Sequence, residues 1–81
     1  MPDDATVRSA AREVVANLVS RPVKDSEPLI SSGTIDSLSI LKLITQLEKK
    51  LHVSIPTETL QPDDFDSVEL IVETVQRVVR V

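Results

Sequence analysis

The chain contains no cysteine, tryptophan or tyrosine, and Gly33 and Phe65 are its only glycine and its only aromatic residue. Without cysteine there is no disulfide, no thiolate metal site and no cysteine nucleophile. A sandwich or hairpin-rich fold would use more turn glycines and more aromatic residues. No apolar run approaches the roughly 20 residues that span a bilayer. The acidic N-terminus, Met1–Asp4, lacks the apolar core of a secretory signal, so we expect a cytoplasmic protein.

Length and charge limit what the chain can be. Its 81 residues are enough for one domain, residues 1–81, because a second hydrophobic core could not be filled. Hydrophobic residues make up 41% of the chain and are almost all aliphatic, which favours an all-α fold. The formal net charge of −4 disfavours nucleic acid and suits docking against basic patches on partner proteins. We expect a monomer.

Apolar periodicity predicts a first helix near the N-terminus. It starts near Asp3 or Asp4, whose carboxylates can cap free N–H groups. It ends by Ser20 or Arg21, because proline disfavours helical geometry in the residue before it and Pro22 follows. Residues three and four apart share one face of a helix. The expected inner face comprises Val7, Ala10, Ala11, Val14, Val15 and Leu18.

A second helix is expected from about Ser37 to Leu51, with Asp36 as its N-cap. Its apolar stripe comprises Leu38, Leu41, Ile44, Leu47 and Leu51, widened by Ile40 and Leu43. The long connection before it, residues 21–35, contains Pro22, Pro28 and Gly33. Such a long loop in a small domain is usually functional or pinned by apolar residues. The expected anchors are Val23, Leu29, Ile30 and Ile35, and we expect Gly33 to adopt a backbone conformation that other residues avoid.

The C-terminal third is expected to complete a bundle. His52–Pro56 forms a short extended link, and Pro56–Leu60 and Pro62–Phe65 form one or two short helical turns. The last helix opens at Asp66, with Glu69 as its capping-box partner. Its inner face comprises Val68, Ile71, Val72, Val75, Val78 and Val79. Three long helices and one short helix predict a small four-helix bundle.

One ordered set of motifs runs through most of the chain. Residues 33–38 read Gly-Thr-Ile-Asp-Ser-Leu and open the leucine-rich second helix. An extended link then ends in Ile55-Pro56, and acidic turns lead to Phe-Asp-Ser-Val at residues 65–68. This pattern resembles the acyl carrier proteins and the peptidyl, or aminoacyl, carrier proteins. The resemblance covers nearly the whole chain in order.

The resemblance implies a function for Ser37. In that family the serine of the Asp-Ser-Leu stretch carries a covalently attached phosphopantetheine arm, which holds acyl or aminoacyl intermediates as thioesters. The implied partners are a phosphopantetheinyl transferase, a ligase that loads the cargo, and downstream acyl-processing enzymes. Such a carrier is not itself an enzyme. Fatty acid and secondary metabolite biosynthesis are the implied settings, and Asp36 is implied to engage the modifying enzyme or its metal ion.

The residues around Ser37 suit that role on physical grounds. A serine just inside a helix start points its hydroxyl outward, and an anion attached there lies beside the positive end of the helix. A second Asp-Ser-apolar start occurs at Asp66-Ser67-Val68, but no glycine turn precedes it. We interpret Ser67 as a cap only and Ser37 as the attachment site.

The second helix departs from the carriers of fatty acid synthesis, in which it is strongly acidic. Here its exposed positions include Lys42, Gln46, Glu48, Lys49 and Lys50, so it is mildly basic. We therefore expect partners that differ from the usual fatty-acid enzymes. The residues expected to contact them are Asp36, Leu38, Lys42 and Lys49.

Other interpretations stay open. Asp36 and Ser37 could merely cap a helix, and the protein could then be a helical protein–protein interaction module that is never modified. His52 is the sole histidine and is expected in a solvated link, so no Ser-His-acid set can be assembled around it. The acidic group Asp63-Asp64-Asp66 lacks the spacing of a calcium loop, so we expect no metal site. Lys49 and Lys50 could simply be solvated at a helix end.

Overall fold

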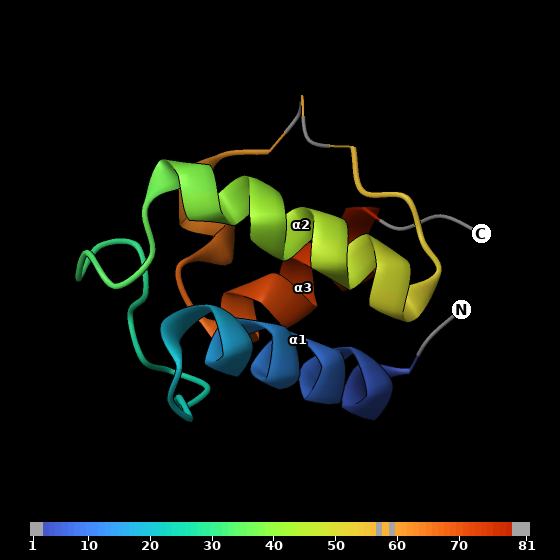
Figure 1. The fold of residues 1–81 in the computed structure, drawn as a ribbon. Helices are drawn as coiled ribbons and strands as arrows, with labels where there is room; N and C mark the ends of the chain where they lie inside the picture. Colours follow the sequence, from blue (N-terminus) through green and yellow to red (C-terminus); the bar gives the residue numbers. More distant parts are fainter. Residues whose placement is uncertain (1–2, 57, 59, 79–81) are drawn as a thin grey trace.

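The computed structural model describes residues 3–56, 58 and 60–78, and within these residues all regular structure is helical. These residues contain three α-helices, α1 (Asp4–Val19), α2 (Ser37–Leu51) and α3 (Val68–Val78) (Figure 1). A short 3-10 helix, η2 (Pro62–Phe65), lies between α2 and α3 in the sequence. The all-α prediction is confirmed. Because the short element is a 3-10 turn, the described residues do not form a clear four-helix bundle. None of their helices has the length and apolar character needed to cross a membrane.

The first helix begins and ends as predicted. Asp3 is its N-cap, and its Oδ1 accepts a hydrogen bond from the Thr6 N–H at 2.8 Å, which satisfies one of the free donors of the first turn. Ser20 ends the helix in a left-handed conformation, with a φ of 60°, and its N–H bonds to the Ala16 carbonyl. The predicted inner face is confirmed, since Leu18 packs partly buried against the core and the other five residues are buried.

The second helix has the predicted bounds but a different buried face. Its buried residues are Ile40, Leu43, Ile44 and Leu47. Leu38 is 76% exposed and Leu41 is 60% exposed, so their assignment to the inner stripe was wrong. An α-helix turns by about 100° per residue, which places position 38 almost opposite position 40. The two leucines therefore lie on the outer face of α2.

The start of α3 also differs from the prediction. Ser67 Oγ accepts a hydrogen bond from the Leu70 N–H at 3.2 Å, and α3 begins at Val68. Ser67 is therefore the capping residue, and the expected capping box between Asp66 and Glu69 was wrong. The Asp66 carboxylate bonds instead to residues 29–31, far away in the sequence.

The remaining expectations concern the C-terminal third. Pro62–Phe65 forms the predicted short turn, whereas the turn expected at Pro56–Leu60 includes Thr57 and Thr59, which lie outside the described residues. Val79 also lies outside them. The other residues predicted for the inner face of α3 contact the core, with Val78 partly buried and the rest buried: Val68, Ile71, Val72 and Val75.

The core lies where the helices meet. α1 packs against both α2 and α3, and η2 packs against α3 and α2. Phe65, at the end of η2, is almost fully buried among the aliphatic side chains. α1 and α2 run in opposite directions, and the long connection between them closes one end of the molecule (Figure 1). That end is where α2 begins.

The connection is anchored as predicted. Leu29 and Ile35 are buried, and Val23 and Ile30 pack partly buried against the core. Gly33 has a φ of +80°, a conformation that residues with a Cβ rarely adopt. The exposed turn that contains Gly33 therefore leads from a buried anchor to the start of α2.

Candidate functional site

The candidate site is built at the N-terminus of α2. Asp36 has extended backbone geometry and its Oδ1 accepts a hydrogen bond from the Ser39 N–H at 2.8 Å, so it is the predicted N-cap. The same hydrogen bonding to Ser39 lowers the pKa of the Asp36 carboxyl, with a smaller contribution from the positive charge of Lys42. Asp36 is therefore ionised at neutral pH and remains exposed to solvent.

Ser37 is the first residue of α2 and is exposed. A phosphoester on its hydroxyl could extend into solvent, close to the positive end of the helix dipole. The Asp36 carboxylate already lies at this helix end and interacts with the positive charge of Lys42. A phosphate added at Ser37 would be attracted by the same lysine charge. An exposed hydroxyl at a helix start fits a covalently attached phosphopantetheine.

Ser67 provides a comparison within the same chain. It also stands beside an aspartate at a helix start, but it is only 8% exposed. Its hydroxyl is engaged in capping α3 through the Leu70 N–H. A large group could not be attached there without disturbing the helix start, whereas Ser37 has no such obstacle.

The other predicted site residues lie on the outer face of α2. Positions 38, 41, 42, 45 and 49 share that face because each lies three or four residues from another of them. Leu41, Lys42 and Lys49 line one open hollow of about 330 Å³, together with Thr45 and Gln46. Leu38 is exposed nearer the start of the helix. This face combines two exposed leucines with two lysines.

The charge of α2 is opposite in sign to that of the whole chain. It contains three lysines and one glutamate, a formal charge of +2, whereas the chain carries −4. Lys50 is paired with Glu13 of α1 at 3.0 Å, which leaves Lys42 and Lys49 as the lysines of the outer face. The surface beside Ser37 is therefore apolar and mildly basic.

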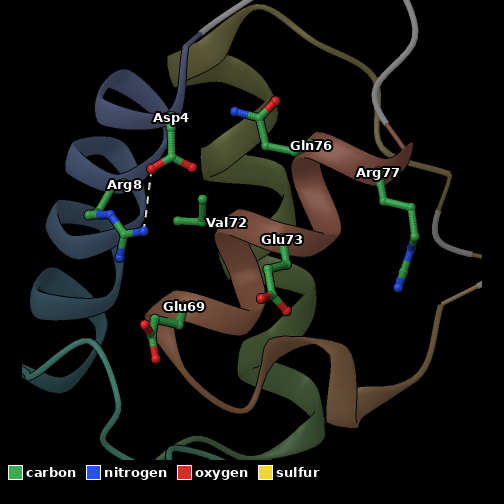
Figure 2. A pocket seen from close by; sticks show the side chains of 7 residues that line it. All are labelled: Asp4, Arg8, Glu69, Val72, Glu73, Gln76 and Arg77. Carbon is green, nitrogen blue, oxygen red and sulfur yellow. Dashed lines mark hydrogen bonds and ion pairs between the residues drawn. The ribbon is translucent and has the colours of Figure 1, made fainter.

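A second hollow lies away from α2. It has a volume of about 490 Å³ and lies between α1 and α3, where Figure 2 shows Arg8 reaching Asp4 along α1 and Glu69 and Glu73 projecting from α3. Arg8 is held by Asp4 and by Asp25. Because charged side chains line this hollow and the predicted site residues lie elsewhere, it is separate from the candidate site.

The structure also reveals residues that sequence analysis missed. The Asp66 carboxyl bonds to residues 29–31 of the connection, and its pKa is lowered chiefly by the backbone N–H of Ser31. Asp25, in the same connection, binds Arg8 and Arg12 of α1. Both carboxylates fix the loop that precedes Ser37. No local pattern signals these contacts, because the partners are 13 to 37 residues apart.

Comparison with known proteins gives the family. Residues 6–75 match the model of the family described as phosphopantetheine attachment site. The matched region contains the whole of the candidate site and extends from α1 into α3. It therefore covers far more than half of the chain.

Several relatives of the chain are named D-alanyl carrier proteins. The chain is 30% identical over 71 residues to the D-alanyl carrier protein of Streptococcus gordonii, and the match covers 85% of this chain and 90% of that protein. The D-alanyl carrier protein of Streptococcus thermophilus gives the same identity and coverage. That of Streptococcus sanguinis is 28% identical, with equal coverage.

Proposed function

The chain belongs to the phosphopantetheine-attachment family of acyl and peptidyl carrier proteins, whose members carry that cofactor covalently, and we propose that Ser37 holds the arm. The observation that carries this proposal is the contrast between the two Asp-Ser helix starts. Ser37 is exposed beside the Asp36 cap, whereas Ser67 is buried and engaged in capping α3.

In the attachment reaction the carrier supplies only the hydroxyl group of Ser37. Ser37 Oγ would lose its proton and bond to the phosphorus of the arm, while the bond from that phosphorus to the rest of the arm donor breaks and the donor's phosphate leaves. The terminal thiol of the attached arm would then hold cargo as a thioester. The start of α2 offers a fixed, solvent-facing hydroxyl, and Lys42 offsets part of the negative charge around Asp36. Residues 1–81 act as one carrier domain in this proposal, and η2 corresponds to the short helix of the expected four-helix carrier fold. Catalysis belongs to the partner enzymes.

The cargo that we propose is a small aminoacyl group. The support comes from the relatives, which are named D-alanyl carrier proteins. A mildly basic α2 also differs from the acidic face expected of a fatty-acid carrier. A D-alanyl or similar group on the arm would require an aminoacyl ligase to load it and a downstream enzyme to accept it.

We propose that these partners dock around the start and the outer face of α2. The proposed contact residues are Asp36, Leu38, Lys42 and Lys49. An enzyme that reads this face would present an apolar patch to the exposed leucines and acidic groups to the two lysines. Charge reversal at Lys42 and Lys49 should slow loading by the ligase and change its dependence on salt, because the attraction is screened by ions.

The test of the attachment site is intact mass. The chain is incubated with a broad-specificity phosphopantetheinyl transferase and its arm donor, and the wild type is compared with Ser37→Ala and Ser67→Ala. We expect one arm on the wild type and on Ser67→Ala, provided that the latter folds, and none on Ser37→Ala. An arm on Ser37→Ala would refute the assignment. A wild-type chain of unchanged mass would favour the unmodified interaction module.

A further inference from the structure

The Asp66 carboxylate joins two segments that are distant in sequence. Its Oδ1 accepts hydrogen bonds from the N–H groups of Leu29, Ile30 and Ser31 at 3.1, 2.7 and 2.9 Å. Its Oδ2 accepts a hydrogen bond from the Ser31 hydroxyl at 2.9 Å. An ionised carboxylate only accepts hydrogen bonds, so four donors suit it well. The side chain therefore fixes three consecutive residues of the connection.

Those residues open the turn that leads to the candidate site. The Ile35 N–H bonds to the Leu29 carbonyl at 2.9 Å, and the Gly33 N–H bonds to the Ile30 carbonyl at 3.0 Å. Leu29 and Ile35 are buried, whereas residues 31–34 between them are exposed. The next residue after Ile35 is the cap of α2. Fixing residues 29–31 thus fixes both the exposed turn and the start of the helix.

We propose that Asp66 is a positioning residue for arm attachment: it holds the turn at residues 31–34 in the arrangement that the phosphopantetheinyl transferase recognises beside Ser37. This inference rests on the proposed function of Ser37. The fold itself has other supports for this junction, since the Leu29 N–H also bonds to the backbone carbonyl of Asp66 at 2.6 Å. Replacing the side chain should therefore loosen the turn without removing every link to it.

Loss of the Asp66 side chain should weaken binding of the carrier by the transferase and not the chemical step. If only a fraction of the molecules holds the turn correctly, the apparent affinity of an enzyme for the carrier falls by that fraction. The chemical step at Ser37 is unchanged once the complex has formed. Loss of the Asp66 carboxylate should therefore raise the KM of the transferase for the carrier and leave kcat nearly unchanged.

The experiment compares Asp66→Ala and Asp66→Asn with a control that weakens the fold elsewhere. Thr74→Val is that control, because the buried Thr74 donates through Oγ1 to the Asp64 carbonyl at 2.9 Å, a hydrogen bond that does not involve residues 29–31. For each full-length variant, the transferase kcat and KM are measured with the carrier as the varied substrate. Amide hydrogen exchange is followed at Ile30 and Ser31.

We expect Asp66→Ala to raise KM about tenfold, with kcat within about twofold of the wild type. Asp66→Asn should raise KM less, because its amide oxygen can still accept hydrogen bonds from the backbone N–H groups. Thr74→Val should leave KM unchanged. Exchange at Ile30 and Ser31 should accelerate in Asp66→Ala and not in Thr74→Val.

Several results would overturn the inference. Unchanged KM in Asp66→Ala despite faster exchange would show that the transferase does not read the turn, and an equal rise in Thr74→Val would show general destabilisation. If Asp66→Ala does not fold, Asp66→Asn and Ser31→Ala carry the test, and unchanged KM in both rejects the inference. A wild-type chain that gains no arm overturns the proposed function instead, so the two failures are distinct.

Discussion

The guanidinium of Arg12 holds the carboxylate of Asp25 through two parallel hydrogen bonds, from Nε to Oδ1 at 2.7 Å and from Nη2 to Oδ2 at 2.8 Å. Arg8 adds a third bond, from Nη1 to Oδ2, at 2.8 Å. The backbone carbonyl of Asp25 accepts a hydrogen bond from the Glu69 N–H at 3.0 Å. One residue of the connection therefore binds α1 through its side chain and the first turn of α3 through its backbone.

This arrangement predicts an acid-sensitive contribution to stability. Hydrogen bonding to Arg12, together with Arg8, lowers the pKa of Asp25 from 3.8 to about 2. Because the folded pKa is the lower one, the carboxylate stabilises the fold at neutral pH, and this stabilisation is lost as pH falls from near 4 through 2. Asp25→Asn should cost about 1 kcal/mol at pH 7, since the pair is partly exposed and screened. Urea unfolding at pH 7 and pH 3 measures the difference, which should be smaller at pH 3.

The control for Asp25 lies in the same loop. Glu27 pairs with Arg21, which lies beyond the end of α1, and not with the two arginines within α1 that hold Asp25, so Glu27→Gln should cost less than Asp25→Asn. Equal losses for the two variants, or a loss for Asp25→Asn that does not change with pH, would contradict the structural role given to Asp25.

Leucine-to-alanine substitutions on the two faces of α2 should change stability by very different amounts. Leu47 is fully buried and Leu41 is 60% exposed. Leu47→Ala should cost about 2–5 kcal/mol of unfolding free energy, because it removes buried methyl groups and leaves a cavity. Leu41→Ala should change stability by less than about 0.5 kcal/mol. Urea unfolding of the two variants checks this.

The same pair separates folding from docking. In the proposed function, Leu41→Ala should slow cargo loading by the ligase although the fold is intact, because the side chain lies in the hollow shared with Lys42 and Lys49. A stability loss for Leu41→Ala as large as that for Leu47→Ala would show that Leu41 packs in the core and is not available to a partner enzyme.

Gly33 predicts a third stability effect. Its φ is +80°, and beyond its chain neighbours no atom lies within 4 Å of the place that a Cβ would occupy, so an added methyl group would meet backbone strain and no steric contact. Gly33→Ala should therefore cost about 1 kcal/mol, and Gly33→Asn less, because asparagine tolerates positive φ better. Thermal unfolding compares the two variants. Equal melting temperatures for Gly33→Ala and the wild type would contradict the left-handed conformation.

Local signals predicted much of this fold. The caps Asp3 and Asp36 were found because a short acid before an apolar helix satisfies free N–H groups wherever it stands. Gly33 was found because a single glycine in a loop usually marks unusual backbone geometry. The attachment role given to Ser37 came instead from the resemblance to carrier proteins, because an Asp-Ser helix start by itself indicates only a cap. Whether Ser37 carries the arm stays a prediction.

Other features depend on contacts that no local pattern contains. α2 is rich in leucine on both sides, and counting apolar residues alone did not tell which side faces α1; Leu38 and Leu41 were misplaced for this reason. Asp66 fitted a capping pattern, but Ser67 beside it caps α3, which leaves Asp66 to bind Ser31. Only the packing of the helices brings residues 66 and 31 together.

The last prediction concerns where the cargo lies. A core this well packed resists opening, since Ile71 and Val75 are essentially fully buried and Ile44 nearly so. A cavity for even a few methylenes costs several kcal/mol, whereas each buried methylene returns only about 0.8 kcal/mol. A short or polar cargo such as an aminoacyl group cannot offset that cost, so it should stay on the arm in solvent. A long acyl chain is the only cargo with enough apolar surface to enter.

Methyl NMR of the arm-bearing protein tests this directly. Between the free thiol and an aminoacyl thioester, the methyl shifts of Ile44, Ile71 and Val75 should barely change. Leu41 was expected on the inner stripe of α2, but it is 60% exposed, so its methyl groups serve as the surface control. A long-chain acyl thioester is the positive control for an opened core. Large shifts at Ile71 and Val75 with the aminoacyl form would mean that the interior does admit small cargo, because those side chains contact the core and not the solvent.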